Sequence, residues 1–305
     1  MDRREFLKKS MLLTAGALIG GSLFSETSAA KGAKQNGIPR KKKSIGLQLY
    51  SIGGDMSADA AQALRQISEM GYSTAETASY GDGKFYGRTP AEFRKMAEDL
   101  GIAVTGAHIA RNLDKNDMQG CMDWWKQACD AQAAVGGKTI VMPYFPVGST
   151  LADLQDYCDY FNRVGEIANA AGLRFGYHNH SHEFNKIEGQ VIEDYMIENT
   201  DPDKVFFELD VYWASKGGVN PSAYIQKYAG RFPLLHIKDV DIIGASETID
   251  FESIFKAAYK QGLEEYYVEI EANSLPPMLC ARKSAEYLNV SKFYTVAAKK
   301  SFSAG

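Results

Sequence analysis

From residue 44 onward, short apolar runs alternate with longer amphipathic ones. The short runs have the length and the β-branched or aromatic content of strands, and the longer runs repeat their apolar residues at helical spacing. Eight short runs are present, at residues 44–50, 73–78, 103–109, 138–144, 174–180, 204–211, 233–240 and 266–272. Strands that alternate with helices are typical of βαβ units and a parallel sheet.

Eight strand–helix repeats with short connections predict an α/β fold, a (β/α)8 TIM barrel, as a single domain over residues 45–305. An open, doubly wound sheet is the alternative. It usually carries a glycine-rich phosphate-binding turn after its first strand, and Gly53-Gly54 does not complete that fingerprint. Several predicted helices end in a glycine, the residue that ends a helix in the left-handed conformation at least cost, namely Gly71, Gly101, Gly136, Gly172 and Gly262.

Polar residues interrupt the apolar alternation near the carboxyl ends of the strands, where barrel enzymes carry their catalytic groups. Side chains two positions apart on a strand share a face. In residues 204–211 the apolar members can pack on helices, which leaves Glu208 and Asp210 on the inner side. The same reasoning turns the following side chains inward: Glu76, His108, His178, His180, His236, Lys238, Glu269 and Glu271.

The segment RFGYHNHSHEF, residues 174–184, holds three of the five histidines of the chain. Strands five to eight thereby bring His, Asp, His and Glu to one mouth of the barrel. Imidazole and carboxylate groups are suitable ligands for a divalent cation such as Mn, Zn, Mg or Co. A structural polar layer is the alternative, and Asp210 alone could cap a helix. The expected metal ligands are His178 or His180, Asp210, His236 and Glu269.

The motifs ELDVYW (208–213), LLHIKD (234–239) and YYVEIE (266–271), together with GYHNHSHEF (176–184), resemble the sugar phosphate isomerase/epimerase superfamily, whose barrel is called xylose isomerase-like. The resemblance covers residues 45 to about 298 and implies the same four metal ligands. Two positions depart from the ketose epimerases of that superfamily. Strand five offers imidazole where they place Glu, and Trp213 stands where they have another His.

A metal-binding mouth of this kind suits removal of a proton next to a carbonyl. We therefore expect a metal-dependent sugar isomerase or epimerase. A lyase acting by β-elimination on a keto-sugar or glycoside is the runner-up, and a non-catalytic, metal-containing sugar-binding protein is the third possibility. The expected catalytic residues are Glu183, on the loop over the mouth, Lys238 and Glu271, with His180 or Glu271 as the second proton carrier. The expected substrate-binding residues are His108, Trp213, Tyr50 and Tyr144.

The first thirty residues read as an export signal rather than as part of the fold. Arg3-Arg4 precede a short apolar run and small residues around Ala30, which resembles a twin-arginine signal. The apolar run at 11–24 is short for a membrane anchor. We therefore expect removal of residues 1–30, a disordered lead-in at 31–44, a periplasmic or otherwise exported protein, and no stable membrane insertion after removal.

The charge balance narrows the class of partner. The full chain has a formal net charge of −4, and removal of residues 1–30 makes it one unit more acidic. An acidic body without a basic stripe argues against a nucleic-acid partner. Because sugar phosphates are scarce outside the cytoplasm, a neutral or oxidised carbohydrate is the expected substrate. The four cysteines show no C-x-x-C spacing and are expected to be buried free thiols, and the oligomeric state stays open.

Overall fold

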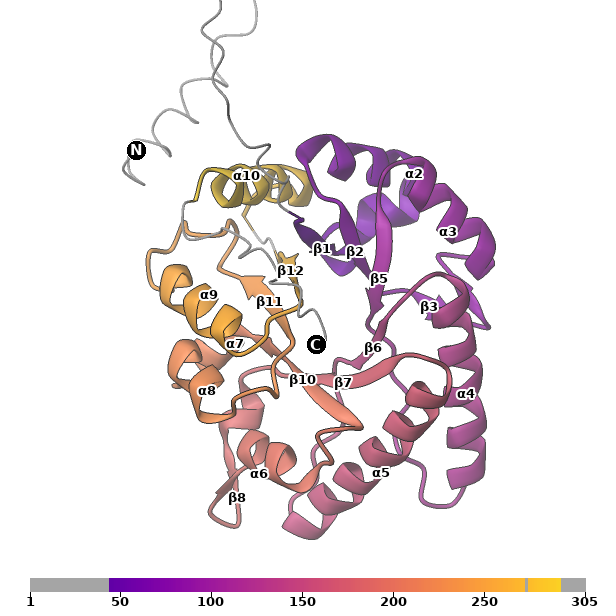
Figure 1. Ribbon diagram of the computed structural model, residues 1–305, viewed down its shortest axis with the longest axis vertical. Coiled ribbons are helices and arrows are strands. Elements are labelled where there is room, and N and C mark those ends of the chain that lie inside the picture. The colour runs from indigo at the N-terminus through magenta and orange to yellow at the C-terminus, as the bar shows by residue number, and fades with distance from the viewer. Residues whose placement is uncertain (1–43, 272–273, 292–305) are drawn as a thin grey trace, which may run out of the picture. The chain divides into compact units, whose positions relative to one another are not determined.

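Eight parallel strands form a nearly closed barrel with helices between them (Figure 1). The computed structural model describes residues 44–271 and 274–291. The expected export signal and residues 31–43 of the expected lead-in lie outside the described residues. The barrel strands are β1 (Gly46–Gln48), β2 (Thr74–Thr77), β5 (Ala103–Ala107), β6 (Thr139–Met142), β7 (Arg174–His178), β10 (Val205–Asp210), β11 (Leu234–Lys238) and β12 (Glu265–Glu269).

The strands follow one another around the barrel in chain order, and β1 pairs with both β2 and β12. Between β5 and β6 the contact continues through backbone hydrogen bonds. The N–H of Lys138 donates to the carbonyl of Thr105 at 2.8 Å, and the N–H of Ile109 donates to the carbonyl of Val141 at 2.9 Å. The predicted (β/α)8 barrel is therefore confirmed.

The helices lie around the outside of the barrel (Figure 1). They are α2 (Gly53–Met70), α3 (Pro90–Asp99), α4 (Met118–Ala134), α5 (Leu151–Ala170), α6 (Ile192–Asn199), α7 (Val211–Lys216), α8 (Pro221–Lys227), α9 (Phe251–Lys260) and α10 (Pro277–Val290). The loops contain two short 3₁₀ helices, η1 (Leu49–Ile52) and η2 (His182–Phe184). They also contain two small hairpins, β3 (Tyr80–Gly81) with β4 (Lys84–Phe85) and β8 (Lys186–Ile187) with β9 (Gln190–Val191).

Local sequence signals explain where these helices begin and end. A capping box of Thr89 and Glu92 starts α3, and Thr150 with Asp153 does the same for α5. The five glycines predicted to end helices all have φ between +75° and +102°. None of the helices within the described ranges is long and apolar enough to cross a membrane. The four cysteines are buried and free, as expected.

The interior of the barrel below its polar layer is filled by a buried cluster of Val141, Phe206, Leu234 and Tyr267. Glycines on other barrel strands make room for the two rings. A Cβ at Gly176 would lie 2.4 Å from the Phe206 ring, and one at Gly106 would lie 2.8 Å from the Tyr267 hydroxyl. This cluster, the barrel plug, closes the barrel beneath the polar residues at the strand ends.

Candidate metal centre and pocket

The carboxyl ends of the strands surround a pocket of about 490 Å³. The alternation of side chains along the strands explains why polar groups line this pocket. Tyr177 faces outward and packs on Phe145 and Phe161, while its neighbour His178 faces into the barrel. The polar residues that line the pocket are His108, His178, His180, Glu269 and Glu271. The rest of the lining is Tyr50, Ala78, Tyr80, Ile109, Ala110, Trp124, Pro143 and Tyr144.

Four predicted ligands come together at the strand ends. We call them the upper donor set: His178, Asp210, His236 and Glu269, each with one potential ligand atom within 4.8 Å of the others. Oδ1 of Asp210 accepts a hydrogen bond from the backbone N–H of Trp213 at 2.8 Å, which caps α7. Its Oδ2 is buried and has no hydrogen-bond partner among the described residues. Asp210 therefore caps a helix with one oxygen and keeps the other for a ligand.

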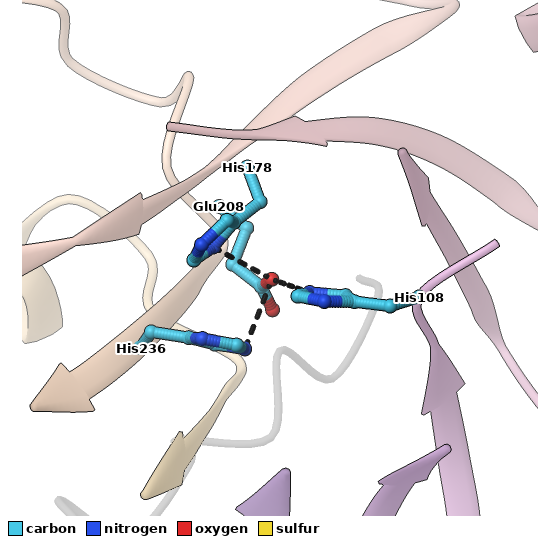
Figure 2. Close-up of side chains that lie close together, drawn as sticks. All are labelled: His108, His178, Glu208 and His236. Atoms are coloured by element: carbon cyan, nitrogen blue, oxygen red, sulfur yellow. Dashed lines mark hydrogen bonds and ion pairs between the residues drawn. The ribbon is translucent and has the colours of Figure 1, made fainter. Parts of the chain in front are cut away.

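A second donor set lies one side-chain layer deeper, because Glu208 precedes Asp210 by two residues on β10. Figure 2 shows three imidazoles converging on Oε2 of Glu208. The distances from this oxygen are 2.9 Å to His108 Nε2, 3.1 Å to His236 Nε2 and 3.5 Å to His178 Nδ1. We call His108, His178, Glu208 and His236 the lower donor set; it shares two imidazoles with the upper one.

Glu76 on β2 supports the lower donor set from the side. Its Oε2 lies 2.7 Å from His236 Nε2 and 3.2 Å from His108 Nε2, and accepts a hydrogen bond from the Gln48 side chain at 2.7 Å. Glu76 and Gln48 are both fully buried. Gln48 was missed in the sequence, although the alternation along the first strand, between Leu47 and Leu49, would have turned it inward.

Burial and neighbouring charges shift the pKa values of these groups in opposite directions. Burial raises the pKa of Glu208 and that of Asp210 to about 7. Burial opposes the charge of His236, but Glu208 and Glu269 beside it hold its pKa well above the ordinary value. Burial likewise opposes the charge of Glu269, and His236 and Lys238 hold its pKa well below the ordinary value. Burial lowers the pKa of His108 to about 4.

The donors of the upper set fit a divalent cation. Buried polar atoms in folded proteins nearly always have partners. Asp210 Oδ2 has no hydrogen-bond partner among the described residues. Two carboxylates and two imidazoles form a mixed oxygen and nitrogen set that suits Mn, Zn, Mg or Co.

Lys238 and Glu271, two expected catalytic residues, are brought together beside the upper donor set. The ammonium of Lys238 lies 2.8 Å from Glu271 Oε1 and 3.2 Å from Glu269 Oε2. It also lies 4.7 Å from the ring centroid of Trp213. Trp213 is thus in contact with the charged groups but does not line the pocket, unlike the other expected substrate-binding residues His108, Tyr50 and Tyr144.

Glu183 lies elsewhere than the sequence suggested. It is fully buried in η2 and does not line the pocket. One oxygen accepts a hydrogen bond from the Tyr177 hydroxyl at 2.5 Å and the other from the backbone N–H of His180 at 2.8 Å. His182 Nε2 lies 3.2 Å from the first oxygen. The carboxylate is therefore engaged by Tyr177, His180 and His182 near the end of β7 and does not face the pocket.

His180 does line the pocket, near the end of β7. Its ring centroid lies 5.1 Å from that of His178 and 5.9 Å from that of Trp213. Tyr50 and Tyr144 also face the pocket and are 61 % and 53 % exposed. Tyr80 and Trp124 were missed in the sequence. They come from a hairpin and from α4, and no strand alternation could have indicated them.

Comparisons with known proteins agree with this architecture. The profile of the xylose isomerase-like TIM barrel family matches residues 64–290, and the chain belongs to this family. A crystal structure of a sugar phosphate isomerase/epimerase from Parabacteroides distasonis ATCC 8503 is 36 % identical, with a TM-score of 0.81, covering 87 % of this chain and 100 % of that one.

More distant relatives differ in the reaction that they catalyse. Inosose dehydratase from Geobacillus kaustophilus is 25 % identical over 201 residues, which are 59 % of this chain and 61 % of that protein. The chain therefore spans about three fifths of this relative. D-psicose 3-epimerase from Clostridium cellulolyticum H10 superposes with a TM-score of 0.63 at 15 % identity, covering 83 % and 99 % of the two chains, and shares the fold.

Proposed function

We propose that this chain is a metal-dependent sugar isomerase or epimerase that removes a proton next to a carbonyl. The observation that carries the proposal is the upper donor set, two of whose members, His178 and Glu269, line the pocket. His178, Asp210, His236 and Glu269 would hold the cation. When bound, the cation supplies positive charge for the carbonyl oxygen of the substrate.

His180 and Glu271 are the proposed proton carriers. Both line the pocket, and they follow different barrel strands, β7 and β12, so they can face a bound sugar from different directions. Lys238 orients the Glu271 carboxylate through the 2.8 Å ion pair. Glu183, which the sequence predicts to move the proton itself, is instead proposed to position the loop that carries His180, through the hydrogen bond to the His180 backbone.

The pocket favours a neutral or oxidised sugar over a sugar phosphate. Its described lining includes the carboxylates of Glu269 and Glu271 and contains no lysine or arginine. A phosphate group is usually bound by such cations or by a helix N-terminus. Tyr50 and Tyr144 offer exposed rings on which a sugar face can pack. Export of the protein, which we also propose, is consistent with such a substrate.

A lyase is the second candidate, and two observations favour it. The inosose dehydratase relative carries out elimination of water, as its name states. Strand five also supplies His178 where ketose epimerases have a carboxylate. Both reactions begin with the same proton removal, but in a lyase the group on the next carbon then leaves with its bonding electrons and accepts a proton.

Exchange of carbon-bound protons tests the proposal. The full chain loaded with Mn²⁺ is incubated in D₂O with neutral ketoses, aldoses, keto-sugars and keto-glycosides, and followed by NMR. Deuterium at the carbon next to the carbonyl, together with an isomeric sugar, supports an isomerase. Deuterium with a conjugated enone, detected by ultraviolet absorption, assigns the lyase. Sugar binding without exchange in any member of the panel would contradict both and indicate a binding protein.

A further inference from the structure

We infer that the lower donor set is a second, nitrogen-rich cation site that selects zinc and competes with the upper donor set. It consists of His108, His178, Glu208 and His236, whose ligand atoms lie within 4.8 Å of one another. The inference goes beyond the proposed function, since binding of zinc here does not require that the chain turn over a sugar.

The geometry of the three imidazoles suits a four-coordinate ion. Their ring centroids are 4.9 Å apart for His108 and His178, 4.9 Å for His108 and His236, and 4.5 Å for His178 and His236. The nitrogen-to-oxygen distances to Glu208 are 2.9, 3.1 and 3.5 Å. In a tetrahedral zinc site with bonds of about 2.0 to 2.1 Å, neighbouring ligand atoms lie about 3.4 Å apart. Small side-chain shifts would therefore accommodate the ion.

Buried polar atoms without hydrogen-bond partners are a second observation that indicates a ligand in the lower donor set. Glu208 and Glu76 are fully buried, and each keeps an Oε1 without a hydrogen-bond partner among the described residues. His178 Nδ1 is also buried and unpartnered in the same sense. Buried carboxylates without compensation are costly, and a divalent cation between them and the imidazoles would remove that cost.

The two donor sets exclude each other because they share His178 and His236. His236 turns Nδ1 toward Glu269 of the upper set, at 3.3 Å, and Nε2 toward Glu208 of the lower set, at 3.1 Å. To bind two cations at once, a neutral imidazole must also lose its one N–H proton and become an imidazolate anion. The two donor sets together therefore hold one cation at a time, in the upper set or in the lower set.

Ligand chemistry decides which ion occupies which set. The lower donor set has three imidazoles and one carboxylate, a composition that suits zinc. The upper donor set has two carboxylates and an opening to the pocket, which suits manganese or magnesium. We expect zinc in the lower set to occupy His178 and His236 and to inhibit the manganese-dependent reaction.

The test measures Zn²⁺ and Mn²⁺ affinity separately on the chelator-stripped full chain, by competition with a chromophoric chelator. Glu208→Gln should weaken Zn²⁺ binding by more than about 100-fold, because a direct ligand is lost. Mn²⁺ binding should fall by about 10- to 100-fold at most, because in the upper donor set Glu208 is only an outer partner of the shared imidazoles. Asp210→Asn should do the reverse. Glu193→Gln, another fully buried carboxylate but located on α6, is the matched control and should change neither affinity.

Equal loss of Zn²⁺ and Mn²⁺ binding in both Glu208→Gln and Asp210→Asn, or absence of Zn²⁺ binding in the parent chain, would overturn the inference. Zn²⁺ binding that needs Glu208 in a chain that shows no proton exchange would support it while contradicting the proposed function. Thermal unfolding and circular dichroism of each variant establish that a loss of affinity comes from the binding site. Should Glu208→Gln fail to fold, His108→Asn supplies the same comparison.

Discussion

The carboxylate of Glu183 accepts a hydrogen bond from the backbone N–H of His180, three residues earlier, at 2.8 Å. Its other oxygen accepts one from the Tyr177 hydroxyl. In Glu183→Gln an amide NH₂ must face one of these two donors. We expect a loss of about 1 to 3 kcal/mol in the free energy of unfolding, typical of an unsatisfied buried group, and a large loss of turnover, with bound metal unchanged. Urea unfolding, elemental analysis and the exchange assay measure the three quantities.

The matched variant is His180→Asn, which removes the proposed proton carrier and leaves the Glu183 hydrogen bonds in place. It should lose turnover, by about 10² to 10⁴ as is typical of general acid–base groups, with little loss of stability. If Glu183→Gln keeps nearly parental turnover, the positioning role proposed for Glu183 is wrong.

Asp210→Asn and Glu269→Gln are expected to lose the activating cation. Each removes a charged oxygen from the upper donor set, and the remaining imidazoles favour a different ion. After dialysis against Mn²⁺ and removal of the excess, elemental analysis should find about one ion per parental chain and much less in either variant. Glu271→Gln, outside both donor sets, should retain the ion. Retention of Mn²⁺ by both ligand variants would place the cation elsewhere.

Glu193 should make the protein less stable as the pH rises. The carboxyl is fully buried on α6, and neither oxygen has a hydrogen-bond partner among the described residues. Burial, followed by the nearby charges of Glu183 and Asp194, holds its pKa well above the ordinary value of 4.5, and Arg231 only partly opposes this. The folded state therefore binds the proton more tightly than the unfolded state does.

The resulting stability is fully present below the pKa of the unfolded chain and is lost as the pH rises through the pKa of the folded one. This group can contribute a slope of at most about 1.4 kcal/mol per pH unit. Glu193→Gln removes its contribution, so its advantage over the parent should grow between pH 5 and pH 8. Urea unfolding across this range measures the difference, and a constant difference would show that the Glu193 carboxyl does not titrate there.

Replacement of Arg3-Arg4 by two lysines should keep the protein in the cytoplasm of its host. Twin-arginine export requires the arginine pair, and the proposed signal ends near residue 30. Fractionation with an antibody should find the parental protein, shortened at its N-terminus, outside the cytoplasm. An uncut parental protein in the cytoplasmic fraction would contradict export and would make sugar phosphates reasonable substrates again.

The strand alternation predicted much of this architecture because a barrel imposes two different environments on the two faces of each strand. Phe207 and Leu209 had to face the helices, so Glu208 and Asp210 had to face the interior. The same rule located His236 and Glu269. It fails where a strand ends: after His178 the chain forms a 3₁₀ turn, and the direction of Glu183 is set by Tyr177 and not by its position in the sequence.

The division of the inward-facing polar residues into two donor sets also could not be predicted from the sequence. Alternation turned Glu76, Glu208 and His108 inward, but it did not show that three imidazoles would meet at one oxygen of Glu208. That meeting depends on the register between β7 and β10, in which His178 lies opposite Glu208, and between β10 and β11, in which Asp210 lies opposite His236. Registers between strands are fixed by the packing of the whole barrel.

The barrel plug makes the pocket a dead end. Phe206 and Tyr267 pack into the space that glycines leave open, so we expect the pocket mouth to be the route to the donor sets. In the proposed reaction, we expect substrate to enter and product to leave by the same mouth, past Tyr50 and Tyr144. Product that is still bound in the pocket prevents the next substrate molecule from binding. We therefore expect simple competitive inhibition by product.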